Sequence, residues 1–360
     1  MNNQEFSQTV LAWFDHSGRK HLPWQQQRTA YRVWVSEIML QQTQVKTVIP
    51  YFDRFMQCFP AINDLATSSL DDVLHLWTGL GYYARGRNLH KCAHEIIEKY
   101  NGEFPDDPAL LNQLPGIGKS TAGAIVSIAY NKRATILDGN VKRVLARFHG
   151  VSDWPGKTSI ANKLWRYAEN YTPHQRCADY SQAMMDLGAT LCTRNQPKCD
   201  LCPLKQDCIA GQAGNPQDFP GKKPRRRLPV KNTQMLMLTN KENNTVFLQM
   251  RPLPGIWGGL WSFPELEQGD DAVSYSQRHF GKVVRFNSWD SFRHTFSHYH
   301  LDIQPISIVI ERTNNRINQS EKKGWFSHQQ VTQLGLSAPV KRLLTALLTK
   351  TKPNLLEYDN

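Results

Sequence analysis

The sequence predicts a mostly α-helical N-terminal region, residues 1–212, followed by a smaller α+β domain at residues 231–350. Three observations support this division. Apolar residues recur at three- and four-residue steps as far as about residue 212, which is the period of a helix. A stretch rich in Pro, Gly and cations follows at 213–230, and strand-like segments come after it. With 360 residues, the chain is long enough to bury two separate cores.

Helices in the N-terminal region are predicted from amphipathic runs bounded by turn residues. In chain order, the runs are SEIMLQQTQVKTVIPYFDRFMQCF, STAGAIVSIAY, NVKRVLARFHG and YSQAMMDLGATLC. Turn-forming Gly, Pro and Asp pairs in EFPDDP and VSDWPGK punctuate them. No repeat of fixed period is present in the sequence.

The stretch at 213–230 has the composition of a linker, and the segments after it define the second domain. Residues 221–232, which overlap its end, contain no acid and carry the cations Lys222, Lys223, Arg225, Arg226, Arg227 and Lys231. Such a segment either follows an anionic surface or is simply solvated. Beyond it, TQMLMLT, NTVFLQM and LDIQPISIVI predict strands, and APVKRLLTALLTK predicts a helix with Pro339 near its start. Residues 351–360 are expected to form a loose tail.

The excess of basic side chains favours an anionic partner. There are 43 Lys and Arg against 31 Asp and Glu, for a formal charge of +12. Nucleic acid is the commonest such partner and an anionic membrane surface is next, although a merely basic enzyme is an alternative. No apolar run approaches the roughly 20 residues of a membrane span. The N-terminal MNNQEFSQTVLAWFDH lacks the pattern of a signal peptide, so we expect a cytoplasmic protein.

Four of the seven cysteines lie close together and predict a metal centre. They are separated by six, two and five residues, all within 17 residues. The four are Cys192, Cys199, Cys202 and Cys208. This spacing does not match a secreted disulfide framework, and four thiolates can hold an iron–sulfur cube or, less in keeping with this spacing, zinc. The centre could shape a basic loop or carry electrons.

The segment LPGIGKSTAGAI, residues 114–125, resembles a phosphate-binding loop but lacks its first glycine, since Gln113 occupies that position. The turn is too small to wrap a triphosphate. A helix that opens at about Gly118 would present backbone N–H groups to a single phosphate of a nucleic-acid backbone. A plain turn between two helices is the alternative.

Several motifs in order along the chain resemble one known family. They are SEIMLQQTQV, GLGYYARGRNL, LPGIGKSTAGAI, ATILDGNVKRVLARF and SQAMMDLGATLC, together with the cysteine spacing. They resemble the MutY-type adenine DNA glycosylases, iron–sulfur members of the helix–hairpin–helix DNA glycosylase superfamily. The resemblance covers residues 5–212 and reappears at FRHTFSHYHLDI, residues 292–303.

This resemblance implies a helix–hairpin–helix glycosylase fold with one 4Fe–4S cluster. It implies a monomer that acts on double-stranded DNA containing an A:8-oxoguanine or A:G mispair and has no membrane partner. Release of the mispaired adenine would prevent G:C to T:A mutation, and the protein would associate with the nucleoid if it is bacterial.

Two carboxylates are the expected catalytic groups. Breaking an adenine–deoxyribose bond requires an acid near the base and a carboxylate near the developing sugar cation. Glu37 lies among Val35, Ile38 and Met39, an apolar setting that would raise its pKa. The resemblance implies that Glu37 protonates adenine, that Asp138 stabilises the oxocarbenium ion, and that Asn140 assists beside the sugar. Without the resemblance, Glu37 would be a first-turn helix glutamate, and Asp138 would lie in a turn with Asn140 as N-cap.

Ser120 bears on the reaction type. The resemblance places it where the related endonuclease III group carries a nucleophilic lysine, so it implies a monofunctional glycosylase. Lys119 is rotated about 100° around the helix from that position. It is therefore expected to face phosphate or solvent. Lys142 could trap an opened sugar slowly.

The resemblance also implies contacts with the extruded base and the DNA. Gln42 and Tyr82 would wedge into the stack, and Trp24 and Gln182 would line the adenine pocket. Buried aromatic residues in a helical array are also common core residues, which is the alternative for Trp24 and Tyr82. The remaining residues implied at the DNA are Thr43, Leu80, Gly116, Gly118, Lys119 and Lys142.

The second domain resembles a Nudix fold whose hydrolytic motif is incomplete. GGLWSFPE supplies Gly259 and Glu265 at the expected spacing, but Val273 and Ser274 replace the Arg–Glu pair. Nucleotide hydrolysis is therefore not expected. The resemblance instead implies that this domain recognises the opposite base through Phe296, Ser297 and His298, which would otherwise belong to a strand with alternating aromatics.

Three functions remain open from the sequence. The first is an adenine glycosylase, the second an endonuclease III-like lyase, and the third a non-catalytic iron–sulfur DNA-binding protein. Ser120 and the additional domain disfavour the second.

Overall fold

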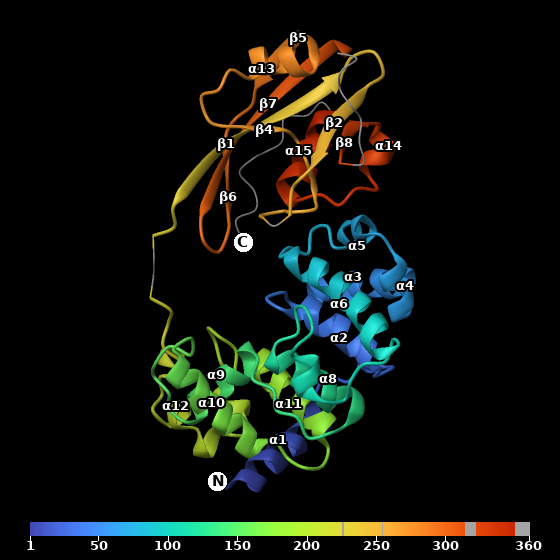
Figure 1. Ribbon diagram of the computed structural model, residues 1–360. Coiled ribbons are helices and arrows are strands. Elements are labelled where there is room, and N and C mark those ends of the chain that lie inside the picture. Colours follow the sequence, from blue (N-terminus) through green and yellow to red (C-terminus); the bar gives the residue numbers. More distant parts are fainter. Residues whose placement is uncertain (225–226, 254, 314–321, 350–360) are drawn as a thin grey trace. The chain divides into compact units, whose positions relative to one another are not determined.

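The computed structural model describes residues 1–224, 227–253, 255–313 and 322–349 (Figure 1). The chain divides into two compact units. Unit 1 contains Met1–Thr67 and residues 88–224, and unit 2 contains Ser68–Arg87 with the described residues from 227 onward. A short segment of the N-terminal region therefore belongs, by its contacts, to the same unit as the C-terminal domain. Arg225, Arg226 and the expected tail at 351–360 lie outside the described residues.

Unit 1 is built from helices, as the periodicity predicts. They are α1 (Asn3–Ser17), η1 (Pro23–Gln25), α2 (Ala30–Leu40), α3 (Val45–Cys58), α4 (Ile62–Thr67), most of α6 (Ala84–Tyr100), α7 (Pro108–Leu111), α8 (Lys119–Tyr130), α9 (Gly139–Phe148), α10 (Thr158–Tyr171), α11 (Cys177–Thr190), η2 (Cys199–Leu201), η3 (Lys205–Asp207), α12 (Ile209–Gln212) and η4 (Pro216–Asp218). The first residues of α6 belong to unit 2.

Helix α8 forms the centre of unit 1. Its residues Ala122–Ile128 are all buried, as expected for a helix that is apolar on every side. It packs against α2 and α11, and α11 packs in turn against α1 and α9. These contacts bring together helices that carry the candidate catalytic residues. Each large apolar side chain buried in this core contributes about 1.5–3 kcal/mol to stability.

Part of the basic stretch after α12 is attached to unit 1. The Arg147 Nε atom donates to the Phe219 carbonyl at 3.0 Å. The Lys223 ammonium lies 5.9 Å from the centre of the Trp154 ring. This part of the stretch therefore follows the protein surface.

Unit 2 is a mixed sheet flanked by helices, so the α+β prediction is confirmed. Its strands are β1 (Val230–Asn240), β2 (Thr245–Met250), β3 (Trp261–Ser262), β4 (Glu265–Leu266), β5 (Gly281–Ser288), β6 (Phe292–Thr295), β7 (His300–Thr313) and β8 (Lys323–Phe326). Its helices, besides the start of α6, are α5 (Leu70–Leu76), α13 (Ala272–His279), α14 (His328–Val331) and α15 (Ala338–Thr349).

The long strands β1 and β7 lie side by side at the centre of the sheet. They pair in parallel with Leu236 opposite Ile306 and Leu238 opposite Ile308, and the sheet order is β3-β2-β1-β7-β5. Their alternate side chains form an apolar core with Phe247. Strand β6 pairs antiparallel with the start of β7, so residues 296–299 form the tip of a hairpin (Figure 1).

No helix within the described ranges is both long enough and apolar enough to cross a bilayer.

Candidate active site

Glu37 lies near the C-terminal end of α2. The helix begins at Ala30, where the Thr29 side chain accepts a hydrogen bond from the Arg32 N–H. Ser36 and Ile38, on either side of Glu37, are buried, and Glu37 itself is partly buried. The first-turn interpretation is therefore wrong. Burial raises the pKa of Glu37 to about 8, with a further contribution from the negative charge of Asp138. At neutral pH this carboxyl group retains its proton.

Asp138 lies at the start of α9 and caps that helix. Its Oδ1 atom accepts a hydrogen bond from the Val141 N–H at 2.8 Å, and its Oδ2 atom accepts one from Asn140 Nδ2 at 3.1 Å. The expectation that Asn140 is the N-cap is wrong, because Asp138 has that role. Burial raises the pKa of Asp138, while the hydrogen bonds from Val141 and Asn140 oppose that rise. The structure thus brings Glu37 and Asp138 within electrostatic reach of each other.

A network of hydrogen bonds connects Asp138 to the cysteine loop. Asn140, which donates to Asp138, accepts a hydrogen bond from Arg143 at 2.9 Å. The same guanidinium donates to the Gly188 carbonyl at 2.7 Å and, through Nε, to the Cys192 carbonyl at 2.7 Å. Arg143 therefore fixes the orientation of the Asn140 amide and links α9, α11 and the first cysteine.

Two glycines allow residues 135–140, which include the start of α9, to pass close to neighbouring helices. A Cβ atom at Gly123 would lie 2.1 Å from the Thr135 carbonyl oxygen. One at Gly188 would lie 2.6 Å from the Asn140 Cβ atom. Neither distance is possible for real atoms, so α8 and α11 approach this segment only because these positions lack side chains.

Ser120 supports the same segment. Its hydroxyl oxygen accepts a hydrogen bond from the Leu137 N–H at 2.9 Å, one residue before Asp138. Lys119 lies at the surface, where its ammonium is 3.2 Å from Glu169 and 4.0 Å from the centre of the Trp165 ring. Lys142 is partly buried on the first turn of α9.

Gln182 belongs to a buried polar group on α11. Its Nε2 atom donates to Asp186 at 2.9 Å, and Asp186 is fully buried. Arg19 balances this carboxylate through its guanidinium at 2.6 Å and its backbone N–H at 2.7 Å. The Gln182 amide is therefore held in one orientation, because its NH₂ group is bound.

The other N-terminal candidates lie in and after η1 and α2. Trp24 in η1 is buried against Phe52, with ring centres 5.4 Å apart. Gln42 is exposed and has a positive φ of 59°, which is uncommon for a residue with a side chain. Thr43 follows it and donates its backbone N–H to the Leu40 carbonyl at 3.2 Å. Gln42 thus lies at a sharp turn on the surface.

The turn between α7 and α8 carries the two glycines expected to bind a phosphate. Gly116 has a φ of 78°, and a Cβ atom there would lie 2.9 Å from Asn88 Cβ. Gly118 is the N-cap of α8 and supplies no side-chain hydrogen bond. The N-terminus of α8 is therefore not capped by a side chain of its N-cap residue.

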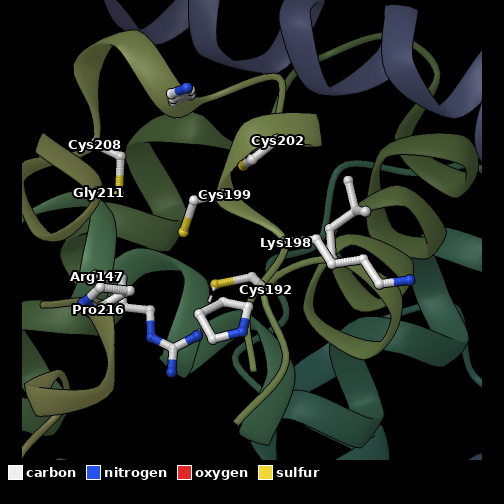
Figure 2. A pocket seen from close by; sticks show the side chains of 11 residues that line it. Arg147, Cys192, Lys198, Cys199, Cys202, Cys208, Gly211 and Pro216 are labelled. Carbon is white, nitrogen blue, oxygen red and sulfur yellow. Dashed lines mark hydrogen bonds between the residues drawn. The ribbon is translucent and has the colours of Figure 1, made fainter. Parts of the chain in front are cut away.

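The four clustered cysteines line one pocket. Figure 2 shows their side chains around a shared space, next to Arg147 and Lys198. Arg147 is buried and donates to Cys192 Sγ at 3.3 Å, with further bonds to the carbonyls of Thr193 and Arg194. Burial raises the pKa of the Cys202 thiol to about 12. In the described ranges, no three His, Cys, Asp or Glu side chains form a site for a single metal ion.

In unit 2, Leu80 and Tyr82 lie on the turn between α5 and α6. Leu80 is buried, whereas Tyr82 is 50% exposed. Tyr82 has a φ of 48°, and Gly81 before it has a φ of 75°. Two successive residues in the left-handed region turn the chain sharply, and this turn directs the Tyr82 ring toward solvent.

The tip of the β6–β7 hairpin carries the residues expected to recognise the opposite base. The Phe296 N–H donates to the Tyr299 carbonyl at 2.9 Å, so Ser297 and His298 are the exposed central residues of a turn and not part of a strand. Phe296 packs on Trp257 with ring centres 5.2 Å apart. Glu265, the remaining acid of the Nudix motif, forms an ion pair with Arg251.

Comparison with known proteins places this geometry in a family. Residues 35–170 match the HhH-GPD superfamily of base excision DNA repair proteins, and residues 234–346 match the NUDIX domain. An adenine DNA glycosylase of Buchnera aphidicola subsp. Acyrthosiphon pisum is 42% identical, and the alignment covers 96% of this chain and 98% of that protein.

The chain belongs to the adenine DNA glycosylase family.

More distant members of the adenine DNA glycosylase family also align over most of the chain. The Homo sapiens protein is 32% identical over 94% of this chain and 73% of its own length. Among solved structures, a thermostable thymine-DNA glycosylase is similar with a TM-score of 0.54 and 27% identity, over 59% of this chain and 97% of that one. An endonuclease III–DNA complex, at 22% identity and a TM-score of 0.51, covers 59% and 98% and shows the shared fold.

Sequence reasoning missed three residues that contact the candidate site residues or the cysteine loop. Arg143 and Arg147 extend from α9 and form several hydrogen bonds with Asn140 and the cysteine loop. Asp186, on α11, accepts a hydrogen bond from Gln182. The spacing of Arg143 and Arg147, four residues apart on one helix face, was the available signal. Nothing in the sequence around Asp186 distinguishes it from an ordinary helix aspartate.

Proposed function

We propose that the protein is an adenine-specific DNA glycosylase of base excision repair. It hydrolyses the N-glycosidic bond of adenine mispaired with 8-oxoguanine or guanine in duplex DNA. The observation that carries this proposal is the pairing of a protonated carboxyl group, Glu37, with a second carboxyl group, Asp138, in a member of this family. The positive charge of the chain supports a DNA substrate.

Glu37 provides the proton that makes adenine a better leaving group. Its pKa of about 8 keeps the carboxyl group protonated at pH 7, which is the requirement for a general acid. As the glycosidic bond breaks, its electron pair moves to the base, and the proton from Glu37 neutralises the charge that develops there.

Asp138 stabilises the positive charge that develops on the sugar. Its two oxygen atoms are held by the Val141 N–H and the Asn140 amide, so the carboxylate needs no reorganisation when the charge appears. The approach of a cationic sugar favours ionisation of a carboxyl group whose pKa burial has raised. Asn140 acts through Asp138 and is itself oriented by Arg143.

Water completes the reaction. After base release, the carboxylate of Glu37 accepts a proton from a water molecule that attacks the sugar carbon. The carboxyl group is thereby restored, and the products are free adenine and an abasic site.

Strand cleavage is not part of the proposed reaction. A lyase needs an amine that forms a covalent bond with the sugar, and the Ser120 hydroxyl is instead engaged with the Leu137 N–H. Lys119 is occupied by Glu169 and Trp165 at the surface. Lys142 is the remaining amine of the candidate set, and it allows at most slow trapping of the opened sugar.

The base pocket is formed by Trp24 and Gln182. The NH₂ group of Gln182 is bound to Asp186, so its carbonyl oxygen is the group available to accept a hydrogen bond from the adenine amino group. Gln42 and Tyr82 enter the stack when adenine is extruded, a step that costs a few kcal/mol and less at a mismatch. Thr43 supports the turn that carries Gln42, and Leu80 supports the turn that carries Tyr82.

We also propose that Cys192, Cys199, Cys202 and Cys208 hold one 4Fe–4S cluster. The donor set is four thiols lining one pocket, and the buried guanidinium of Arg147 next to Cys192 suits an anionic group. Burial raises the pKa of the Cys202 thiol, which means that it disfavours the ionised form. An ionised thiol at this position therefore needs a positively charged partner. When bound, the cluster would hold the loop that carries Lys198 and Lys205 near the DNA backbone.

The remaining contacts bind the DNA and read the opposite base. The N-terminus of α8, with Gly116, Gly118 and Lys119, binds a single DNA phosphate. Phe296, Ser297 and His298 at the hairpin tip recognise 8-oxoguanine. We propose that the protein acts as a monomer in the cytoplasm, and at the nucleoid if it is bacterial. Along the chain we propose domain limits at residues 212, 231 and 350, although residues 68–87 pack with unit 2.

One experiment distinguishes this proposal from its alternatives. A duplex with one A:8-oxoguanine pair is incubated with the protein and divided into samples with and without alkali. Breakage at adenine only after alkali supports the glycosylase, direct nicking supports a lyase, and binding alone supports a non-catalytic protein. Glu37→Gln and Asp138→Asn should bind this duplex but release no adenine, whereas substantial turnover by either would refute the assignment. Iron and sulfide analysis of the purified protein tests the cluster.

A further inference from the structure

The turn that carries Tyr82 is attached to the C-terminal part of unit 2. Helix α5 and this turn, residues 68–87, belong to that unit although they lie within the N-terminal region of the sequence. Val73, Leu74 and Trp77 are completely buried. The segment is therefore an integral part of the unit and not a loop on its surface.

Helix α5 packs closely against the segment between α14 and α15. A Cβ atom at Gly335 would lie 3.0 Å from Leu74 Cβ and 3.2 Å from the Leu74 carbonyl carbon. The His75 Nδ1 atom donates to the Leu334 carbonyl oxygen at 3.3 Å. At the other end of α5, Trp261 donates its indole N–H to Asp71 at 3.3 Å.

Leu336 forms hydrogen bonds to both ends of the Tyr82 turn. Its backbone N–H donates to Thr78 Oγ1 at 3.2 Å, and its carbonyl accepts from the Tyr83 hydroxyl at 2.9 Å. The same Tyr83 hydroxyl accepts a hydrogen bond from the Gly79 N–H at 3.2 Å. One backbone position after α14 therefore anchors the turn on both sides, and Tyr83 connects that anchor to the interior of the turn.

The interior of the turn is held by two further side chains. Trp77 donates its indole N–H to the Gly81 carbonyl at 3.1 Å, and Arg85 donates to the carbonyls of Leu80 and Gly81, both at 3.2 Å. The Arg85 guanidinium also lies 5.5 Å from the centre of the Tyr82 ring. These bonds maintain the positive φ angles that expose Tyr82, which cost free energy in residues with side chains.

We infer that Tyr83 and Leu336 position the Tyr82 turn for base extrusion, so the C-terminal unit contributes to extrusion as well as to recognition of the opposite base. Tyr83 is a positioning residue, since it acts on the DNA only through Tyr82. The inference rests on the proposed function and deepens it, because it assigns the geometry of the wedge to a contact with the α14–α15 segment.

The test compares Tyr83→Phe and Thr78→Val in the full-length protein with matched controls. Tyr83→Phe removes only the bridging hydroxyl, and Thr78→Val removes the acceptor for the Leu336 N–H. Tyr275→Phe, on α13, is the control for the tyrosine. The Thr78 hydroxyl also donates to the Leu74 carbonyl at 3.1 Å. Thr345→Val is therefore the control for the threonine, because the Thr345 hydroxyl donates to the Lys341 carbonyl at 3.0 Å in the same way. Thermal unfolding verifies that each variant is folded.

Two quantities are measured on a duplex with one A:8-oxoguanine pair. The first is the single-turnover rate of adenine release per active molecule, with the active fraction determined from the burst amplitude. The second is extrusion, measured by the fluorescence of 2-aminopurine in place of the target adenine, with Glu37→Gln added to each variant to stop base release.

We expect Thr78→Val to lower the single-turnover rate about 5-fold, the value of one hydrogen bond. Tyr83→Phe removes two hydrogen bonds and should lower the rate at least about 5-fold. In both variants the 2-aminopurine fluorescence change should fall together with the rate. DNA affinity and the rates of both controls should stay within about 2-fold of the wild type. A lower active fraction with an unchanged rate and unchanged fluorescence would overturn the inference, since that result indicates a purely structural role. Absence of adenine release by the wild type would instead refute the proposed function.

Discussion

Replacement of Glu37 by glutamine should stabilise the protein while it abolishes activity. Burial and the charge of Asp138 raise the pKa of Glu37 from 4.5 to about 8. At pH 7 the unfolded chain has this carboxyl group ionised, whereas the folded protein keeps it protonated. The difference lowers the free energy of unfolding by about 3 kcal/mol at that pH. Glutamine has nearly the same shape and does not titrate, so Glu37→Gln should avoid this loss.

The sign of the effect fixes its pH dependence. The folded state binds more protons than the unfolded state between about pH 4.5 and 8, so the wild type loses stability as the pH rises through this window. Below pH 4.5 both states are protonated and the loss disappears. The difference in stability between Glu37→Gln and the wild type should therefore be small near pH 4.5, rise up to pH 8 and level off above it.

Thermal unfolding measured from pH 5 to pH 8 tests this reasoning. A difference of about 3 kcal/mol corresponds to roughly 6–12 °C in Tm for a unit of about 200 residues. Glu98→Gln, at an exposed position on α6, is the control for removal of a carboxylate and should shift Tm by no more than about 2 °C at any pH. A Tm difference for Glu37→Gln that is the same at pH 5 and pH 8 would refute the raised pKa.

Three further predictions follow from the same geometry. The single-turnover rate of adenine release should fall about tenfold per pH unit above pH 8 as Glu37 loses its proton; a rate that is flat to pH 10 would contradict its role as the acid. Gly188→Ala should destabilise the protein by at least about 2 kcal/mol in denaturant unfolding, because the new Cβ meets Asn140 at 2.6 Å. The control Gly139→Ala, with nothing within 4 Å of the new atom, should be tolerated, and equal effects would count against the packing argument. Ser120→Ala should slow adenine release about 5-fold through loss of one hydrogen bond, with no gain in strand cleavage on a denaturing gel, and an unchanged rate would show that this bond is dispensable.

Much of the fold could be predicted from local patterns. The helices of unit 1 follow from three- and four-residue apolar spacing, and the long strands β1 and β7 follow from β-branched alternation. Glu37 could be recognised as a candidate acid, since its apolar neighbours in the sequence are also its neighbours in α2. At the N-cap of α9 two residues compete for the same role, and there the prediction was wrong. Both Asp138 and Asn140 are good N-caps, and only the structure shows that Asp138 has this role.

The sequence by itself determined the two kinds of secondary structure, the four-cysteine loop and the motifs of the adenine DNA glycosylase family, because each of these is a property of residues close together in the chain. The tertiary structure decided which distant residues act on one another. The charge of Asp138 reaches Glu37 across 101 positions, Arg143 joins Asn140 to the cysteine loop, and residues 68–87 pack with the C-terminal unit. These relations depend on helix packing and on close approach at glycines, and such contacts between remote segments leave no periodic signal in the sequence.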